Sequence, residues 1–405
     1  MADYDPDRDL QVLHGDCLQV LEDLPANHVH AVVTDPPYGL AFMGRDWDDF
    51  SPRDYQGFSE NWARRAYRVL KPGGHLLAFS GNRTHHRMMT GLEDAGFTVR
   101  DTITWHYGSG FPKGKSVDDA LDDVAPDQAD DWAGWNTTLK PATEFIAVCR
   151  KPIDRDSVAR NHLAHGTGAL NVGACRVGTE HRVNQPTGTD ANVYADIDVD
   201  AQEPEEVEGR WPANVVLDPV TERVLDEQTG DVSGGDTRGQ CDGQRPGGFA
   251  DVGADSGDPE PNSQVYADTG GASRFYYTAK ATKAERTMNG RIDNPHPTVK
   301  PQDLIAWLTR LVTADGHRVL DPFAGSGTGG VAAKDLGRRW VGVERNPDWV
   351  SVAQARIGVT PDDPSALLKD ARQSGLTDFA GDAGGQDQGD SQAATDGGEP
   401  DGGQG

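Results

Sequence analysis

The 405-residue chain has few cysteines, few basic residues and no long apolar run. Its four cysteines, Cys17, Cys149, Cys175 and Cys241, lack the paired spacing that holds zinc or a disulfide framework. We therefore expect a reducing compartment and no metal site. No stretch of about 18 apolar residues is present, and the amino terminus lacks a basic segment followed by an apolar core. These absences predict a cytoplasmic protein without a membrane span or a signal peptide.

Basic residues are scarce, since 38 Lys and Arg face 65 Asp and Glu and give a formal net charge of −27. Such a charge repels the phosphates of nucleic acid in dilute salt. Either the chain does not contact nucleic acid, or it works in a very salty cell where charge repulsion is screened within a few ångströms. The excess of aspartate, the low lysine content and the hydrophobic content of 36% favour the second explanation, a halophile-like protein that needs molar salt.

Against this background, the motif Asp35-Pro36-Pro37-Tyr38 is the most informative feature. It follows the apolar run 31–34, so it places a polar turn at the carboxyl end of a predicted buried strand, where open α/β sheets hold their functional groups. The turn offers a carboxylate, two fixed φ angles and an aromatic face, which suit a planar heterocycle with an amino group. A bare four-residue string of this kind also occurs as an ordinary strand-ending turn, so the rest of the chain has to decide.

A second strand, turn and helix pattern lies near the other end of the chain. A predicted strand leads into Asp321 and a loop in which Gly325, Gly327 and Gly330 fit G-x-G-x-x-G, and the next predicted strand ends in Glu344. Glycines let a backbone approach a ligand, and an acid at this spacing accepts hydrogen bonds from ribose hydroxyls. The pattern predicts a cofactor with an adenosine moiety and would suit NAD as well. Glycines that only let a helix pack on a strand are the alternative.

Together the two motifs resemble the beta class of amino-group DNA methyltransferases, in which the catalytic motif comes first, a target-recognition region follows and the cofactor loop comes last. Five further segments match that class in order, residues 13–17, 70–75, 105–111, 140–144 and 296–301. The matches cover roughly residues 10–150 and 290–360, and the resemblance is thin in between. Gly329 stands where many relatives carry a second threonine.

Strands that alternate with helices at both ends of the chain predict an α/β fold with a doubly wound sheet. The resemblance implies that it is a Rossmann-like methyltransferase sheet with an inserted target-recognition region. Residues 97–105 and 145–149 would form the antiparallel hairpin that closes the sheet. The expected helices cover residues 18–24, 59–70, 84–95, 302–312, 331–336 and 347–357. The expected regions are the catalytic half 1–151, the target-recognition insertion 152–290 with disordered acidic loops, the cofactor half 291–360 and the disordered acidic tail 361–405.

Two features of the middle region bear on DNA contact. The densest basic stretch is Arg150, Lys151, Arg155 and Arg160, which we expect to contact the DNA backbone, although the neighbouring acids argue the other way. Ordered islands at 162–175, 210–217 and 273–277 mix apolar anchors with Arg, Asn and Thr, the residue types that contact bases and phosphates. Trp211 and Phe275 in these islands would either contact DNA or pack against the host domain.

The resemblance assigns roles to individual residues. The catalytic set is Asp35, Pro36, Pro37 and Tyr38. The cofactor, S-adenosylmethionine, would be lined by Phe323, Gly325 and Gly327, with Glu344 on its ribose, Asp16 near its adenine, and Thr298 and Lys300 near its methionine end. Tyr38 would stack on a base flipped out of the duplex. Asp35 and the Pro36 carbonyl would accept the two amino hydrogens, and Asp321 would hydrogen-bond the loop.

The predicted activity is site-specific methylation of an exocyclic amine in double-stranded DNA, with N6 of adenine favoured because a serine variant of the motif usually marks cytosine N4 enzymes. Cytosine N4 is the alternative, and more distant ones are an RNA or protein methyltransferase, an NAD-linked oxidoreductase and a silent DNA-binding module. No cysteine lies in the context that methylation of a ring carbon needs. The recognised DNA word, the oligomeric state and a pairing with a cognate restriction endonuclease stay open.

Overall fold

The computed structural model describes residues 4–40, 48, 50–110, 114–184, 205–233, 269–279, 294 and 299–359. The chain divides into two units, Met1–Leu367 and Leu368–Gly405, and every described residue belongs to the first. Thr298, most of the two acidic loops and the acidic tail lie outside the described residues. Among the helices of the described ranges, none is long and apolar enough to cross a membrane.

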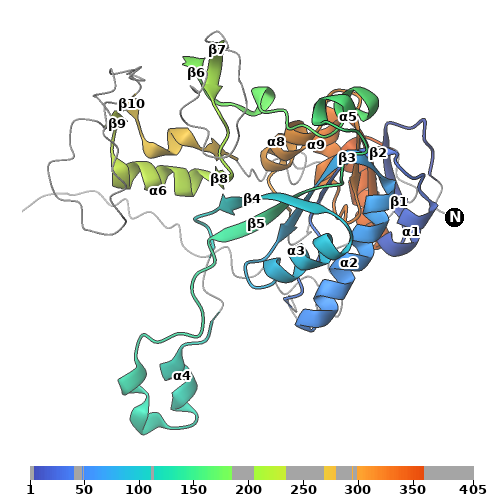
Figure 1. The fold of residues 1–405 in the computed structure, drawn as a ribbon. Coiled ribbons are helices and arrows are strands. Elements are labelled where there is room, and N and C mark those ends of the chain that lie inside the picture. Colours follow the sequence, from blue (N-terminus) through green and yellow to red (C-terminus); the bar gives the residue numbers. More distant parts are fainter. Residues whose placement is uncertain are drawn as a thin grey trace, which may run out of the picture. The chain divides into compact units, whose positions relative to one another are not determined.

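The described strands form a nine-stranded sheet in the order β1-β13-β12-β2-β3-β5-β4-β8-β11 (Figure 1). Their bounds are β1 Leu10–His14, β2 Val29–Thr34, β3 Leu70–Ser80, β4 Thr98–His106, β5 Thr143–Arg150, β8 Val215–Leu217, β11 Tyr277–Thr278, β12 Arg318–Asp321 and β13 Arg339–Glu344. The first five strands in this order, β1, β13, β12, β2 and β3, run parallel, whereas β5 is antiparallel to both β3 and β4. The predicted doubly wound sheet with its closing antiparallel hairpin is confirmed.

The helices mostly follow the expected ranges. Their bounds are α1 Cys17–Asp23, α2 Pro52–Val69, α3 His85–Asp94, α4 Val117–Asp122, α5 Val158–His165, α6 Pro219–Thr229, α8 Gln302–Val312, α9 Thr328–Asp335 and α10 Pro347–Ile357. The short 3-10 turns are η3 Pro126–Gln128, η4 Asp130–Trp132, η5 Gly173–Cys175 and η7 Ala272–Phe275. Two small antiparallel pairs complete the fold, β6 Val177–Asn184 with β7 Glu205–Arg210 and β9 Val232–Ser233 with β10 Thr269–Gly270.

Helix α2 begins earlier than the expected residue 59. Ser51 caps it by accepting a hydrogen bond from the Asp54 N–H, and Pro52 occupies the first turn. Serine followed by proline is a strong start signal for a helix, because the serine oxygen satisfies a free N–H and proline has no N–H to satisfy. The expected helix therefore lacked the first two turns of α2, because apolar periodicity begins only at residue 59 whereas the cap lies at Ser51.

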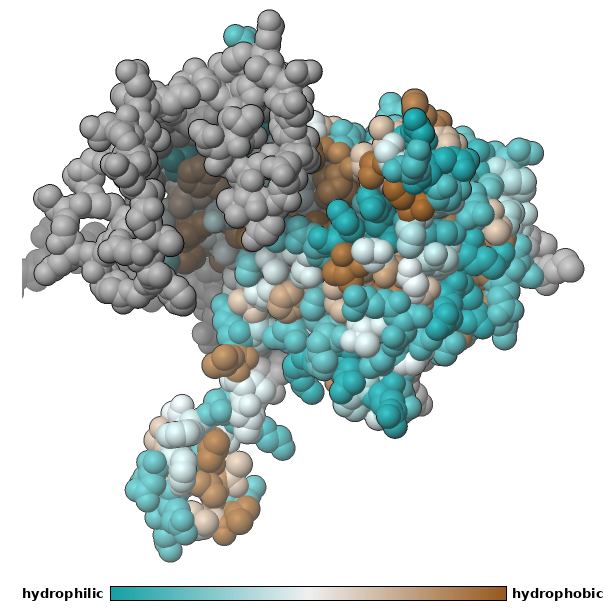
Figure 2. All heavy atoms as spheres, viewed as in Figure 1, coloured by the Kyte–Doolittle hydropathy of each residue, from teal (hydrophilic) through white to brown (hydrophobic). Residues whose placement is uncertain are grey.

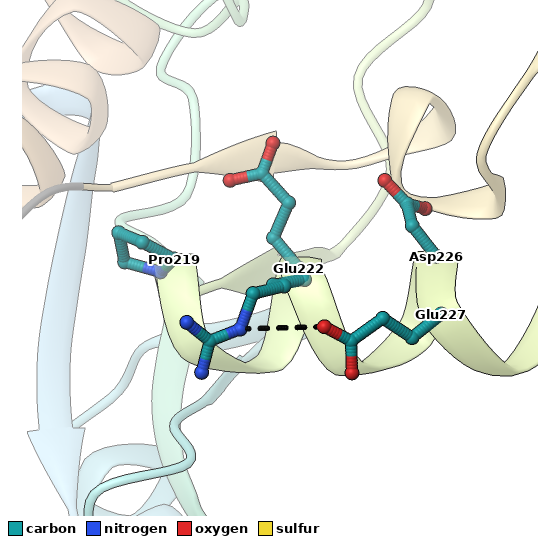
Figure 3. A pocket seen from close by; sticks show the side chains of 5 residues that line it. Pro219, Glu222, Asp226 and Glu227 are labelled. Atoms are coloured by element: carbon teal, nitrogen blue, oxygen red, sulfur yellow. Dashed lines mark ion pairs between the residues drawn. The ribbon is translucent and has the colours of Figure 1, made fainter. Parts of the chain in front are cut away.

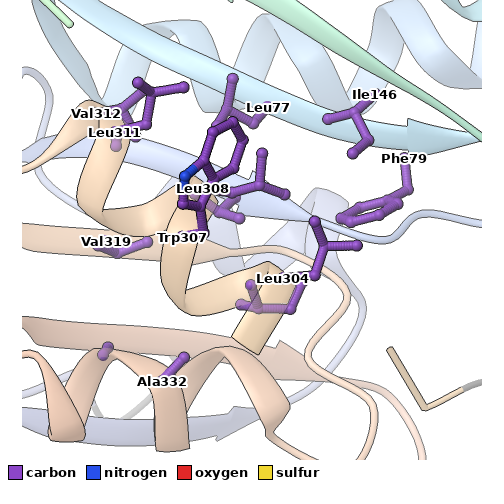
Figure 4. Close-up of a cluster of buried hydrophobic side chains, with 14 of the residues drawn as sticks. Leu77, Phe79, Ile146, Leu304, Trp307, Leu308, Leu311, Val312, Val319 and Ala332 are labelled. Carbon is purple, nitrogen blue, oxygen red and sulfur yellow. The ribbon is translucent and has the colours of Figure 1, made fainter. Parts of the chain in front are cut away.

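Apolar side chains cover both faces of the sheet. Along β3, Leu77 and Phe79 belong to one core cluster, whereas Leu76 and Ala78 belong to the other, as the two-residue period of a strand requires. Helix α8 packs on the first face through Leu304, Trp307, Leu308 and Leu311 (Figure 4). Each such buried side chain contributes roughly 1.5 to 3 kcal/mol. The sheet is thus held from both sides, and its strand ends are fixed.

We expected the middle region, residues 152–290, to be an insertion outside the sheet, but part of it belongs to the sheet. Strand β8 pairs in parallel with β4, and β11 pairs in parallel with β8, so both extend the central sheet. Helix α5 also packs on the host, because the buried Asn161 amide donates to the Pro72 carbonyl at 3.0 Å. Part of residues 152–290 is therefore built into the sheet rather than attached to it.

Between β4 and β5 the chain forms α4, η3 and η4, a segment rich in aspartate. Four of its large apolar side chains are exposed, Val124, Trp132, Trp135 and Leu139, and the two tryptophan rings meet edge to face at 5.2 Å. Figure 2 shows hydrophobic colour on part of the α4 segment, whereas the described surface around α2 and α3 is largely hydrophilic. Its two ends are joined where the Lys140 ammonium donates to the Gly108 carbonyl at 2.7 Å.

Candidate functional site

The two motifs from opposite ends of the sequence meet at one edge of the sheet. Strand β2 ends at Thr34 and pairs with β12, which ends at Asp321. The Thr34 hydroxyl donates to Asp321 Oδ1 at 2.6 Å. The carboxyl ends of neighbouring parallel strands share an edge, so the turn that starts at Asp35 lies beside the glycine loop.

Asp35 has one occupied and one unoccupied carboxylate oxygen. Its Oδ2 accepts a hydrogen bond from the Lys300 ammonium at 2.7 Å. Its Oδ1 is buried, and no described residue donates to it. A buried acceptor without a partner costs about 1 to 3 kcal/mol, so a fold keeps one only where something offsets the cost. The open Oδ1 is where a donor from a substrate would fit.

Tyr38 is fixed at both of its polar groups. Its hydroxyl donates to Glu144 Oε2 at 3.0 Å, and its carbonyl accepts from the Thr84 hydroxyl at 2.6 Å. Burial, then the negative charges of Asp35 and Glu144, raise the pKa of Tyr38 well above its usual value. The phenol therefore stays protonated and acts as a donor, and its ring has a set orientation.

Lys300 completes the cluster. Its side chain is 9% exposed, and its ammonium lies 2.7 Å from Asp35 Oδ2 and 3.4 Å from Glu144 Oε2. Burial lowers the pKa of Lys300, but the two carboxylates outweigh burial, and the net result is a raised pKa. The ammonium also lies 5.2 Å from the ring centre of Tyr38 and 5.1 Å from that of Phe79. Two carboxylates and one ammonium leave the cluster with one net negative charge.

The prolines make the turn rigid, and side chains from elsewhere hold it. The Tyr55 hydroxyl donates to the Pro37 carbonyl at 3.0 Å. The Asp48 carboxylate accepts from the backbone N–H groups of Gly39 and Leu40 at 2.6 and 3.1 Å. Pro36 is buried. Fixed φ angles and these bonds leave the turn little freedom, as a site that must position a substrate requires.

At the glycine loop, Glu344 organises the backbone. Its Oε2 accepts from the Gly325 N–H at 2.9 Å and its Oε1 from the Asn346 N–H at 2.7 Å. Burial raises the pKa of Glu344. An ionised carboxylate has about four acceptor positions, so two remain for hydroxyl donors. The Gly15 N–H donates to the Glu344 carbonyl at 3.0 Å, and Asp16 follows as the cap of α1, so both acids lie at neighbouring strand ends.

The glycines of the loop serve different purposes. Gly327 has a φ of 81°, and a Cβ there would lie 2.8 Å from that of Ala353 in α10. A Cβ on Gly330 would lie 2.6 Å from Ile357. Those two glycines allow close helix packing, the alternative that the sequence left open. Gly325, with a φ of 52° and its N–H on Glu344, belongs to the loop itself.

Phe323 and Asp321 support the same loop. The Phe323 ring meets Trp62 edge to face at 5.6 Å and Phe58 at 6.0 Å. Asp321 Oδ1 accepts from the Phe323 N–H at 3.1 Å in addition to the Thr34 hydroxyl, so it hydrogen-bonds the loop. Burial raises the pKa of Asp321 to about 7, against the lowering effect of these two hydrogen bonds.

One residue of the basic stretch, Lys151, is not available for the DNA contact that we expected. Lys151 is buried, and its ammonium donates to Asn27 Oδ1, the Tyr67 carbonyl and the Leu70 carbonyl at 2.7 to 2.8 Å. Arg155 pairs with Asp154 at 3.7 Å, and Arg160 pairs with Asp156. Lys151 thus stabilises the fold from inside. The carboxylates of Asp154 and Asp156 compete with phosphate for the two arginines.

Exposed aromatic rings with arginines lie further along. Trp211 is 66% exposed, and the Arg176 guanidinium is 5.7 Å from its ring centre. Phe275 is 40% exposed and contacts the guanidiniums of Arg210 and Arg274 at 5.3 and 4.3 Å. Neither ring is packed into the host core. Rings and guanidinium planes at a surface can stack on nucleic-acid bases.

A shallow pocket on α6 has a different character (Figure 3). Its lining is Pro219, Glu222, Arg223, Asp226 and Glu227, with an ion pair of 3.7 Å between Arg223 and Glu227. The Asp226 carboxylate accepts from the N–H and the hydroxyl of Ser273 at 2.8 and 2.7 Å. Three acids against one base repel phosphate, so this pocket does not serve a nucleic-acid backbone. No group of three metal-ligating side chains occurs in the described ranges.

Glu144 is the residue of the cluster that sequence reasoning did not assign. It contacts both Tyr38 and Lys300, yet it lies at the start of β5, far from either motif in sequence. The signal was present, because residues 140–144 match the resembled class and an acid precedes a buried strand. Only the pairing of the strands shows that β5 starts at the edge of the sheet where β3 ends, since Phe145 pairs with Ser80.

Comparison with known proteins identifies the family. The family of DNA methylases that act on N6 or N4 amines matches residues 29–355. The type II methyltransferase M.HindIII of Haemophilus influenzae is 22% identical over 86% of this chain and 95% of its own length. M.HpaI of Haemophilus parainfluenzae is 31% identical over 29% of this chain and 38% of its own length.

Solved structures with a similar arrangement include M1.HpyAVI and the cytosine-N4-specific PvuII DNA methyltransferase. The first has a TM-score of 0.41 and 16% identity, covering 86% of this chain and 99% of that chain. The second has a TM-score of 0.46 and 16% identity, covering 91% of this chain and 90% of that chain. The family match spans most of the sequence, from β2 to α10. The chain therefore belongs to the DNA methylase family, the amino-methyltransferases of DNA.

Proposed function

We propose that this protein methylates an exocyclic amine of a flipped base at a specific word in double-stranded DNA, with S-adenosylmethionine as cofactor. The observation that carries the proposal is the buried Asp35 Oδ1, which has no donor among the described residues and lies in the turn beside the glycine loop. An amino group has two hydrogens to donate, and a fixed carboxylate at a strand edge is the acceptor that this chemistry needs.

The residues around the glycine loop fit the cofactor. The two remaining acceptor positions of Glu344 suit ribose hydroxyls, and Asp16 at the neighbouring strand end suits the adenine side. Phe323, Gly325 and Gly327 of the loop would line the cofactor, and Gly327 is the N-cap of α9. Lys300 would face the methionine end, together with Thr298, which lies outside the described residues. When bound, this cofactor supplies a methyl group on a positively charged sulfur.

The catalytic turn has to make a weak nucleophile react. The amine lone pair of a base is delocalised into the ring, so the nitrogen must move toward tetrahedral geometry. Asp35 and the Pro36 carbonyl accept its two hydrogens and direct the lone pair at the cofactor site. Tyr38 stacks on the extruded base, and such stacking is worth about 1 to 3 kcal/mol, against an extrusion cost of a few kcal/mol.

Adenine N6 is the amine we favour, because the motif carries aspartate rather than the serine that usually marks enzymes of cytosine N4. Cytosine N4 is the second candidate, since its amine has similar chemistry and the same turn would hold it. We assign target recognition to residues 152–290, where Trp211 and Phe275 expose rings beside arginines. The proposed regions are 1–151 for catalysis and 291–360 for the cofactor.

Modification-sensitive long-read sequencing tests the proposal. Unmethylated plasmid DNA is incubated with the purified protein and S-adenosylmethionine in about 2 to 3 M KCl, a range chosen for the acidic surface. An Asp35→Ala variant, checked for folding and for cofactor binding by calorimetry, runs in parallel. We expect methylation at one short word with the wild type and none with the variant, and the modified base decides between adenine and cytosine.

A protein that is folded, binds S-adenosylmethionine and leaves the plasmid unmarked would overturn duplex DNA as substrate, and RNA or protein would be tested next. A folded protein that fails to bind S-adenosylmethionine but binds NAD would overturn the methyltransferase itself. Methylation by the Asp35→Ala variant at the wild-type rate would remove Asp35 from the mechanism.

A further inference from the structure

We propose that Glu144 is a positioning residue for the methyl-transfer reaction: one carboxylate from β5 sets both the orientation of Tyr38 and the place of Lys300, and through Lys300 it leaves Asp35 free to accept the substrate amine. The proposal rests on the function proposed above. It adds a third strand to a site that the motifs alone would build from β2 and the glycine loop.

The contacts converge on a single atom. Glu144 Oε2 accepts the Tyr38 hydroxyl at 3.0 Å and lies 3.4 Å from the Lys300 ammonium. Lys300 in turn donates to Asp35 Oδ2 at 2.7 Å. The Glu144 and Lys300 side chains are 19% and 9% exposed, so water screens these charges far less than it would at a surface. Moving that one oxygen would move the stacking ring and the cation together.

Charge gives Glu144 a second effect. With Asp35 alone, Lys300 would form an ion pair of zero net charge, in which the full charge of the ammonium acts on the Asp35 carboxylate. Glu144 shares the ammonium, and the cluster keeps one net negative charge. A site that handles a cationic cofactor and an amine that becomes positive as it bonds to carbon gains from that charge. Asp35 can then present Oδ1 to the substrate while Oδ2 stays held.

The pH dependence of this cluster involves several groups, from every element that packs on Lys300. The facing titratable or charged side chains are Asp35 and Tyr38 after β2, Tyr107 after β4 and Glu144 on β5. Of these, Asp35 and Glu144 raise the pKa of Lys300. Loss of the Glu144 charge therefore lets Lys300 lose its proton at lower pH.

The test compares Glu144→Gln with Glu144→Asp in the full-length protein, once the wild type has been shown to methylate DNA. Glutamine keeps the shape and an acceptor oxygen without the charge, whereas aspartate keeps the charge. Glu93→Gln on the exposed face of α3 is the matched control. The measurements are kcat from pH 6 to 11, KM for S-adenosylmethionine and the thermal unfolding midpoint.

We expect Glu144→Gln to lower kcat by about tenfold to a hundredfold with KM for S-adenosylmethionine within twofold, and to move the alkaline limb of the kcat profile to lower pH. Glu144→Asp should restore the position of that limb and part of the rate, and Glu93→Gln should match the wild type. A Glu144→Gln profile equal to that of the wild type would overturn the proposal. So would equal losses in both Glu144 variants without any shift of the limb, which would mark a merely structural residue.

These outcomes separate the two proposals. A wild type that leaves DNA unmethylated refutes the proposed function before any Glu144 variant is measured. A wild type that methylates DNA together with an unshifted Glu144→Gln profile refutes only the role of Glu144.

Discussion

At the scale of single residues, the proposed mechanism gives Tyr38 two separable contributions, one from its ring and one from its hydroxyl. Tyr38→Phe keeps the stacking face and loses the hydroxyl with its bond to Glu144, so we expect a loss of a few-fold in kcat/KM. Tyr38→Ala also removes stacking worth about 1 to 3 kcal/mol, which predicts a further loss of roughly 5- to 150-fold. Fluorescence of 2-aminopurine at the target position would report the flipped base in each variant. Equal losses in both would show that stacking on Tyr38 is absent.

Lys151 tests whether the basic stretch supports the fold or contacts DNA. Its ammonium satisfies three buried or partly buried oxygens, so Lys151→Met should lower the free energy of unfolding by about 2 to 4 kcal/mol. Arg160→Met, which breaks an exposed pair with Asp156, should cost less than about 1 kcal/mol. Urea denaturation measures both, and filter binding measures the DNA affinity of the folded fraction. A stable Lys151→Met protein with weakened DNA binding would contradict the structural role.

At the scale of elements, the junction of the glycine loop with α9 depends on close packing. Gly327→Ala would meet two costs, a left-handed φ and a Cβ 2.8 Å from that of Ala353, and should lower the free energy of unfolding by about 2 to 4 kcal/mol. Gly337 has a φ of 67° with nothing within 4 Å of an added Cβ, so Gly337→Ala should cost only about 1 kcal/mol. Chemical denaturation distinguishes them, and equal costs would mean that α10 moves away without penalty.

The sequence predicted those elements whose signals are local. Apolar runs placed the parallel strands, and the glycines and Glu344 placed the loop, because each signal lies within a few residues. Strands β8 and β11 were missed, since each is at most three residues long and carries too little periodicity to detect. Their membership of the sheet comes from pairing with β4, which is a property of the tertiary structure.

The site divides in the same way. The motifs nominated Asp35, Tyr38 and Lys300, and the structure brings these three together. Glu144 was quoted as part of a match but given no role, because its partners are remote in sequence. Lys151 was misread for the converse reason, since its charge is visible in the sequence and its burial is not.

At the scale of the whole molecule, one buried and one half-buried histidine make the free energy of unfolding depend on pH. His75 is 4% exposed, and burial, then Arg150 and Arg100, lowers its pKa to about 4. Burial, then His317 and Lys71, lowers the pKa of His30 to about 3. The unfolded chain protonates both near pH 6.5 while the native chain does not, so stability is full above that pH and falls as the pH drops toward 4.

The slope should reach at most about 1.4 kcal/mol per pH unit for each histidine. Urea denaturation of the wild type and of His75→Leu between pH 4.5 and 7.5, at constant KCl, tests this. In the His75→Leu variant, the number of protons taken up on unfolding should fall by close to one, and the slope of the free energy of unfolding against pH should decrease accordingly. Identical slopes would assign the acid sensitivity to other groups.

The net charge of −27 makes the second prediction at this scale. Screening shortens the Debye length from about 10 Å at 0.1 M salt to about 3 Å at 1 M, which reduces repulsion among the surface acids. We expect the thermal unfolding midpoint to rise steadily from 0.1 to 2 M KCl. A midpoint that does not change with KCl, or that falls, would argue against a halophile-like protein.

The position of β2 between β12 and β3 also sets the order of events during synthesis. Thr34 and its partner Asp321 are 287 residues apart, and ribosomes add roughly 5 to 20 residues per second. For about 15 to 60 s, the nascent chain therefore carries a strand edge whose partner has not yet been made. Such an edge is open to pairing with other chains. Protection of the unfinished sheet, by the repulsion between acidic chains or by a chaperone, is a requirement of this topology.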